Sequence, residues 1–543
     1  MDKTKLAMKK WMLSILVLIL ATFVALAGCT GSSSNSQPSA SPSGNPADTG
    51  SQVSGQQDGT PKRGGTFRIG IPFDAATLGY APDMRFAQDF FMANPAVETL
   101  GVFDENANMR PHLAESWESD PDAKTVTIKL KPGIKFHDGT DFNAEAVKWN
   151  IDNFIAAKRA ELSGLASVDV VDPLTVRLNL SEWNSSLLEA VCTFVYITSP
   201  TAFEKNGGKE WAAKNPVGTG PFQFVSWEKD VGVKYKRFDQ YWQEGQPYLD
   251  AIEFVVIPDQ TSGSAAFRNG EVDAYVMMDP QIVSQLEGAG VIKLLKTGQG
   301  ASGTGLIFNS KDPNSPFHDV RVRQAVAHAI DIPSILKPIF KDYVIETHQW
   351  GVPGIWAQDP NFKGFEYNPE KAKQLLAEAG YPNGFKTKIT IRTTEMVEMF
   401  TAVQAQLAQI GIQADVEPVD LAKFQDMTGK GTWDGMIQYN YRGDADISTY
   451  MPRNFGSGGV LYAPNLDIPA ELDQKFAEIK AARDQETRTK IAHELQRLVY
   501  EKYTLAIPMF VGTSPAILSP KVHGDGINVG YGSVWTPGST WKE

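Results

Sequence analysis

The residues of this sequence best suited to hold a ligand lie between positions 439 and 446, which read Tyr-Asn-Tyr-Arg-Gly-Asp-Ala-Asp. This stretch combines aromatic rings, a guanidinium group, a flexible glycine and two carboxylates. Arg442 is suited to an anionic ligand group or to an ion pair with Asp444. In the latter case the stretch is a solvated loop whose charges pair with one another, and the residue types alone favour neither reading.

No arrangement typical of an enzyme or a metal site accompanies this stretch. The seven histidines are scattered, and none forms an HxxxH or HExxH pair. Residues 298–303 match GxGxxG, but residues 304–309 then have the pattern of a strand, which leaves no helix N-terminus to bind a pyrophosphate. An enzyme is therefore the weaker hypothesis, and a binding protein without cofactor or metal is favoured. A surface hydrolase or a signalling receptor domain is the alternative from another class.

The elements that must position the stretch alternate between helix and strand. Asn368 caps a helix whose first residue is Pro369 and which ends at Gly380. The following patterns are strand 389–393, helix 403–410, strand 412–416, helix 421–427 and strand 435–439. Such a run predicts a mostly parallel sheet covered by helices. Because ligands of open α/β sheets lie beyond the carboxyl ends of strands, the stretch 439–446 occupies the expected place for a site.

Composition bounds the class of protein. A chain of 543 residues is too long for one core, so two or three folding units are expected. With 51 basic and 63 acidic residues the net charge is −12, and no basic stripe is present, which argues against nucleic acid as a partner. The chain has two cysteines, which excludes a disulfide scaffold. Cys192 lies in an apolar context and is expected to be a buried free thiol.

The N-terminus has the pattern of an export signal. Four lysines among the first ten residues precede an apolar run at 11–25, and Leu-Ala-Gly then leads into Cys29. This arrangement resembles the bacterial lipobox, so we predict a signal peptide at 1–28 and lipid attachment at Cys29. Residues 29–62 are then the lipidated cysteine and a flexible linker rich in Ser, Gly and Pro. An uncleaved transmembrane anchor is the alternative.

Several longer motifs carry a resemblance to a known family. They read LAESWE at 113–118, LKPGIKFHDGT at 130–140, NPVGTGPF at 215–222, PFHDVRVRQAV at 316–326 and YNPEKA at 367–372. In sequence, order and spacing they resemble the large solute-binding proteins of bacterial ABC importers, in the family that includes dipeptide-, oligopeptide- and nickel-binding proteins. The resemblance extends from about residue 66 to residue 520. Most of these motifs have structural explanations, such as turn geometry at Pro132-Gly133 and Asp138-Gly139, so they identify the fold without naming the ligand.

The resemblance implies an α/β fold, a two-lobed clamshell like periplasmic binding proteins of type II, cluster C, with an extra inserted subdomain. The implied divisions are lobe I at 63–96, 209–285 and 506–543, the inserted subdomain at 97–208, and lobe II at 286–505. Ligand binds between the lobes, which close over it and dock on a permease driven by ATPase subunits. We expect a monomer, held at the cell membrane by its lipid and facing the periplasm or the extracellular side.

The resemblance also implies a ligand and its contacts. Peptide-binding members hold the peptide mainly through its main chain, and its ammonium group meets an aspartate in a pattern like Trp-x-Gly-Asp. The matching residues here assign Asp444 to the ammonium and Asn440, Tyr441 and Arg442 to neighbouring contacts. The sequence departs from the pattern in three places: Tyr441 replaces Trp, Ala-Asp-Ile-Ser at 445–448 replaces an acidic-Pro continuation, and Thr-Leu-Gly-Tyr at 77–80 replaces Thr-Leu-Asp-Pro. An oligosaccharide or a metal complex therefore stays open as an alternative to a peptide.

Overall fold

The computed structural model describes residues 60–84, 87–104, 108–276, 280–288, 292–295, 302–392, 397–442, 446–512, 516–524 and 537–543. All of them belong to one compact unit, Ser54–Glu543. The predicted signal peptide, Cys29 and most of the predicted linker lie outside the described residues.

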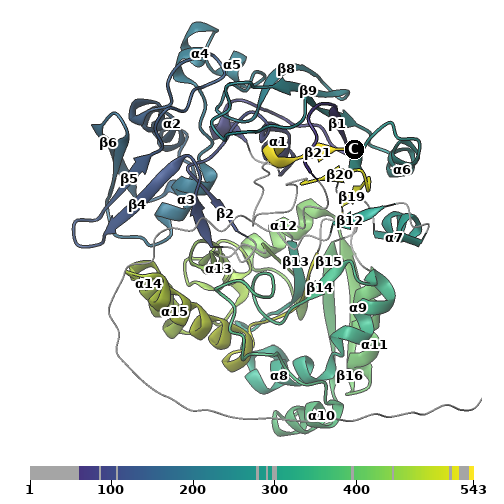
Figure 1. Cartoon of the computed structure of the whole chain (residues 1–543). Helices are drawn as coiled ribbons and strands as arrows, with labels where there is room; N and C mark the ends of the chain where they lie inside the picture. Colours follow the sequence, from purple (N-terminus) through teal and green to yellow (C-terminus); the bar gives the residue numbers. More distant parts are fainter. Residues whose placement is uncertain are drawn as a thin grey trace, which may run out of the picture. The chain divides into compact units, whose positions relative to one another are not determined.

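The first lobe is built on a seven-stranded mixed sheet (Figure 1). Its strands, in spatial order, are β12 (Lys293–Leu295), β19 (Ala516–Leu518), β11 (Ala274–Tyr275), β1 (Thr66–Ile71), β10 (Ala251–Val256), β9 (Gly232–Arg237) and β8 (Phe222–Glu228). β1 lies at the centre and pairs in parallel with β10 and β11. The helices of this lobe are α1 (Ala87–Ala93), α6 (Gln260–Arg268) and α7 (Pro280–Gly288), and β20 (Val522–His523) pairs with β21 (Trp541–Lys542).

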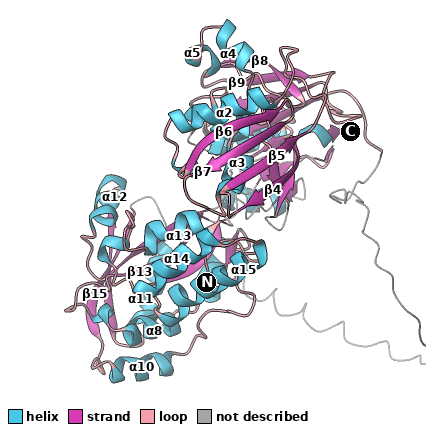
Figure 2. Ribbon diagram, turned by 90° about the vertical axis from the view of Figure 1, so that its left-hand side faces the viewer, coloured by secondary structure: helices cyan, strands magenta, loops and turns pink. Residues whose placement is uncertain are grey.

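The inserted subdomain contains a four-stranded antiparallel sheet with helices beside it (Figure 2). Its elements are β2 (Gly101–Phe103), β3 (Met109–Pro111), β4 (Ala114–Asp120), β5 (Thr125–Leu130), α2 (Ala144–Ala156), β6 (Leu165–Asp172), β7 (Thr175–Leu180), α3 (Leu187–Phe194), α4 (Pro200–Lys205) and α5 (Lys209–Ala212). Alternating apolar residues of β5 and β7 point into the same buried core as Phe67 and Ile69 of β1. The inserted subdomain and the first lobe therefore share one continuous apolar core.

The second lobe is built on a six-stranded sheet in the order β14 (Val344–Glu346), β18 (Ala506–Gly512), β13 (Ser302–Phe308), β17 (Met436–Arg442), β15 (Phe385–Arg392) and β16 (Ile412–Val419). Its helices are α8 (Val320–Ala329), α9 (Ile332–Phe340), α10 (Pro369–Glu378), α11 (Val397–Ala408), α12 (Leu421–Lys430), α13 (Ile447–Phe455), α14 (Ala470–Ala481), α15 (Gln485–Arg497) and the π-helical turn η5 (Leu498–Lys502). β15 pairs in parallel with β16 and with β17, which confirms the predicted β-α-β-α-β run.

Local sequence signals explain most of these helix starts. The side chain of Asn368 accepts a hydrogen bond from the backbone of Lys371 and Pro369 takes the first helical position, as predicted for α10. Asp420 caps α12 in the same way, and the chain leaves that helix through Gly431 with φ of 69°. Residues 302–308 form a strand, as the pattern at 304–309 predicts.

The two sheets exchange strands on either side of the crossings between the lobes. β12 pairs with β19 in the first sheet. β18 pairs with β13 and β14 in the second sheet. The predicted lobe boundaries at 285/286 and 505/506 stay a prediction. Nearly every residue of β18 is buried, so its sequence shows a strand without showing which sheet contains it. The chain therefore passes between the sheets after Leu295 and after Gly512.

Candidate ligand site

The carboxyl ends of the parallel strands in both sheets lie at the edges where the chain crosses from one lobe to the other. β12 ends at Leu295, and β13 begins at Ser302, which pairs with Arg442 at the end of β17. In return, β18 ends at Gly512, and β19 begins at Ala516, which pairs with Leu295. Two crossings of the chain therefore connect the edge where β17 ends with the edge where β11 and β12 end. Ligands of α/β sheets lie at such carboxyl edges, so this is the candidate site.

Asn440 places a buried side-chain amide at this edge. Its backbone N–H donates to the hydroxyl of Tyr462 at 3.0 Å, and its side-chain oxygen accepts from the amide of Gln438 at 3.1 Å. Its side-chain amide nitrogen is buried and has no hydrogen-bond partner among the described residues. A buried polar donor left unpaired costs free energy, and such groups commonly have a partner that is supplied from outside. A carbonyl or carboxylate oxygen of a ligand would satisfy this amide.

Tyr441 fills the core rather than the edge. Its side chain is 4% exposed, and its ring stacks on that of Tyr439 with 4.9 Å between ring centres. On the neighbouring strand it lies over Gly303, where a Cβ would come within 2.0 Å of the tyrosine ring. Burial raises the pKa of Tyr441 well above its ordinary value. Contacts from Tyr441 to a ligand would therefore come from its backbone.

Arg442 is the last residue of β17, and its backbone pairs with that of Ser302. Its side chain and the whole of Gly443, Asp444 and Ala445 lie outside the described residues. The ammonium-binding role of Asp444, like the lipid attachment at Cys29, therefore stays a prediction.

Asp446, the second carboxylate of the stretch, pairs with a residue that the sequence did not indicate. It caps α13 by accepting the backbone N–H of Ser448 at 3.0 Å, and it accepts the guanidinium of Arg488 at 2.9 Å. Burial alone would raise the pKa of Asp446, but the charge of Arg488 and the hydroxyl donors around it hold that pKa below its ordinary value. Asp446 is thus ionised, and its partner comes from α15 rather than from within the stretch 439–446.

On the first-lobe side, the segment 77–80 is packed against neighbouring backbone. The hydroxyl of Thr77 donates to the carbonyl of Ala213 at 3.0 Å. A Cβ at Gly79 would lie 2.2 Å from the carbonyl oxygen of Ala212, so no side chain fits there. The glycine that departs from the Thr-Leu-Asp-Pro pattern therefore lies where two chain segments approach closely.

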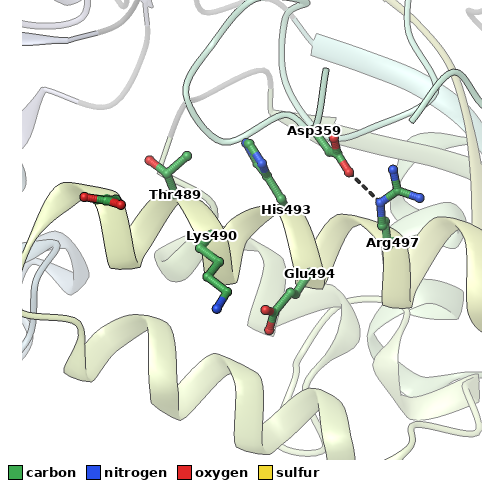
Figure 3. Close-up of a pocket in the computed structure, with 7 residues that line it drawn as sticks. Asp359, Thr489, Lys490, His493, Glu494 and Arg497 are labelled. Atoms are coloured by element: carbon green, nitrogen blue, oxygen red, sulfur yellow. Dashed lines mark hydrogen bonds and ion pairs between the residues drawn. The ribbon is translucent and has the colours of Figure 1, made fainter. Parts of the chain in front are cut away.

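A hollow of about 380 Å³ lies on α15 of the second lobe (Figure 3). It is lined by Asp359, Glu486, Thr489, Lys490, His493, Glu494 and Arg497. Asp359 already pairs with Arg497 at 2.5 Å, and the ring of His493 bonds the carbonyl of Trp356. Charges of both signs that are engaged with each other do not form a focused binding site.

The described residues also bear on the expectations for a membrane span, a metal site and a free thiol. Within them, no helix is both long and apolar enough to cross a bilayer. No group of three or more His, Cys, Asp or Glu side chains in that part of the chain is placed to hold a metal ion. Cys192 is a buried free thiol, as predicted, and burial raises its pKa above the ordinary value.

Comparison with known proteins agrees with this architecture. The profile of the family described as "Bacterial extracellular solute-binding proteins, family 5 Middle" matches residues 108–461. The glutathione-binding protein GsiB of Shigella flexneri is 34% identical over 460 residues, which cover 81% of this chain and 86% of that relative.

Solved structures show the same fold. HbpA2 from Haemophilus parasuis superposes with a TM-score of 0.78 at 24% identity, over 88% of this chain and 100% of that one. The ABC transporter-associated periplasmic binding protein DppA from Helicobacter pylori, in complex with the peptide STSA, gives a TM-score of 0.68 at 25% identity, over 89% and 99%. This chain has the two-lobed fold and belongs to the family 5 bacterial extracellular solute-binding proteins, the binding components of ABC importers, which are not enzymes.

Proposed function

We propose that this solute-binding protein takes up short peptides, glutathione among them, between its lobes and delivers them to an ABC permease. The observation that carries the proposal is the unpaired, buried amide of Asn440 at the carboxyl end of β17. A peptide main chain presents carbonyl oxygens at regular spacing, and an extended peptide can add to the end of a strand in this way. Two relatives support the same class, because one is a glutathione-binding protein and the other is a binding protein in complex with the peptide STSA.

In this proposal Asp444 binds the ammonium group of the peptide. Asp446 is two residues further on and is already neutralised by Arg488, so it is not available for that role. A carboxylate that binds an ammonium away from water contributes strongly, and removal of one partner costs several kcal/mol.

The test is isothermal titration calorimetry with the tetrapeptide Ser-Thr-Ser-Ala, glutathione and maltotriose. We expect at least one of the two peptides to bind, and Asp444→Asn to abolish tight binding without a change in melting temperature. Peptide present at 100 times its dissociation constant should add about 2.7 kcal/mol of stability. Binding of the sugar but of neither peptide would contradict the proposal. Undiminished peptide affinity in Asp444→Asn would remove that residue from the site.

We further propose that Cys29 carries a lipid that holds the protein at the membrane. A single acyl chain gives marginal binding, so stable attachment needs more than one chain. Protein expressed with its signal should partition into the detergent phase of Triton X-114, whereas Cys29→Ala should remain in the aqueous phase. Equal partitioning of the two forms would contradict lipid attachment at this residue.

A further inference from the structure

One short segment of the inserted subdomain, residues 183–189, contacts the second lobe near the end of α14. The indole N–H of Trp183 donates to the carbonyl of Ala482 at 2.9 Å. Ser185 donates its hydroxyl to the carbonyl of Ile479 at 2.9 Å and its backbone N–H to that of Lys480 at 2.9 Å. The last carbonyls of a helix have no partner within the helix, so the inserted subdomain caps α14 from outside.

A buried charged cluster lies beside this cap. Arg488 donates to Glu189 of α3 at 3.1 Å and to Asp446 at 2.9 Å, and its side chain is 6% exposed. The hydroxyl of Ser186 contacts both Asp446 and the hydroxyl of Ser448. One guanidinium thus holds a carboxylate from each side of the contact. The carboxylate on the second-lobe side, Asp446, also caps α13 and lies six residues after Asn440 in the chain.

The contact differs in kind from the other interface of the inserted subdomain. Towards the first lobe, that subdomain shares a continuous apolar core. In the described part of the chain, the buried cores of the second lobe contain none of its residues, and the half-buried Phe103 alone packs against one of them. The inserted subdomain therefore moves with the first lobe, and its polar contact with the second lobe can open without exposing a large apolar surface.

The position of the contact makes it sensitive to movement of the lobes. The chain crosses between the sheets next to β12 and β19, and these strands lie on the opposite side of Figure 1 from α3 and α13. A rotation about the two crossings displaces distant groups most, so opening of the lobes would separate Glu189 from Arg488.

We propose that Arg488 is the centre of a latch between the inserted subdomain and the second lobe, and that through Asp446 it positions the start of α13, the helix that follows the candidate ligand strand β17 in the chain. The latch stabilises the closed, ligand-bound arrangement, so the inserted subdomain contributes to affinity without touching the ligand. This inference rests on the proposed function, because it assigns a positioning role at the same site.

The test uses variants altered only on the inserted-subdomain side. Glu189→Ala removes the carboxylate that faces Arg488, and Trp183→Phe removes one cap donor while keeping a ring. Asp122→Ala is the matched control, because the ion pair of Asp122 with Arg483 joins the same two parts but its side chains are 78% and 61% exposed. Hydrogen exchange of the ligand-free protein should quicken in segments 183–190 and 446–452 of Glu189→Ala and Trp183→Phe, and should stay unchanged in the control.

Affinity for the probes Ser-Thr-Ser-Ala and glutathione then measures the link to the site. Loss of a hydrogen bond to a charged group predicts that Glu189→Ala binds the accepted probe about ten- to a hundredfold more weakly. Unchanged exchange in both segments overturns the latch whatever the probes do, and unchanged affinity with quickened exchange overturns the positioning role. If neither probe binds the unaltered protein, the peptide function fails instead, since the exchange measurement uses no ligand.

Discussion

The carboxylate of Glu98 accepts the indole N–H of Trp242 at 3.0 Å, and the two residues are 144 positions apart in the sequence. The same carboxylate accepts the hydroxyl of Tyr241 at 2.7 Å, the hydroxyl of Thr219 at 2.8 Å and a ring nitrogen of His112 at 3.0 Å. Glu98 is 7% exposed. Residues far apart in the sequence therefore meet at one buried carboxylate. This carboxylate connects the inserted subdomain to the first lobe.

Glu98→Ala should strongly destabilise the protein. The substitution leaves four donors without their acceptor, two of them on the buried residues His112 and Thr219, and loss of one partner from such a charged network typically costs about 3–5 kcal/mol. Urea unfolding followed by tryptophan fluorescence measures the change. The matched control is Glu115→Ala at an exposed strand position, for which a change within about 0.5 kcal/mol is expected. Equal effects of the two substitutions would contradict a central role for Glu98.

His137 should make the protein less stable as pH falls from 6.5 to 4. Burial lowers the pKa of His137 to about 4, although a hydrogen bond to the carbonyl of Gly220 partly opposes the shift. Between these pH values the unfolded chain binds a proton that the folded chain does not, so stability rises with pH across this window. A pKa lowered from 6.5 to about 4 corresponds to about 3 kcal/mol of stability across this window. Glu98, whose pKa is lowered from 4.5, begins to lose its own contribution as the pH falls through about 4.5.

His137→Gln separates this effect from other titrations. Glutamine keeps a donor for the carbonyl of Gly220 but takes up no proton. The difference in unfolding free energy between pH 7 and pH 4.5 should therefore be smaller in the variant than in the unaltered protein. The same pH dependence in both proteins would show that His137 is not the group responsible.

The sequence predicted periodic and capped elements well and predicted contacts between distant residues poorly. The helix from Pro369 was predictable because its cap, its first proline and its apolar stripe are all local signals. The sheet that contains β18 was not, because its apolar residues suit either sheet equally. Arg488 was missed for a related reason. A charged residue on a helix is usually solvated, and nothing near it in sequence shows that Glu189 and Asp446 lie on either side.

Arg323→Met should destabilise the second lobe. The guanidinium of Arg323 is 5% exposed and donates to the carbonyls of four residues, Phe317, His318, Tyr503 and Thr504. It thereby ties α8 to the end of η5, just before β18 begins. Leaving these carbonyls without a donor should cost about 3 kcal/mol in urea unfolding.

Arg321→Met is the control for this prediction. Its guanidinium is 45% exposed and pairs with Asp319, so its loss should cost less than about 1 kcal/mol. If Arg321→Met is the more destabilising of the two, the four carbonyls near Arg323 are satisfied in some other way.

Substitutions of Tyr441 and Gly303 test whether the ligand contacts only the backbone of residue 441. The hydroxyl of Tyr441 reaches the carbonyls of Gln349 and Phe510 only at 3.5 Å, so Tyr441→Phe should leave stability within about 1 kcal/mol and peptide affinity within about twofold. Gly303→Ala should instead cost about 1–3 kcal/mol, because its Cβ would lie 2.0 Å from the tyrosine ring. Calorimetric titration and thermal unfolding of both variants measure these changes. A large loss of affinity in Tyr441→Phe without a loss of stability would place the hydroxyl against the ligand, which its 4% exposure argues against.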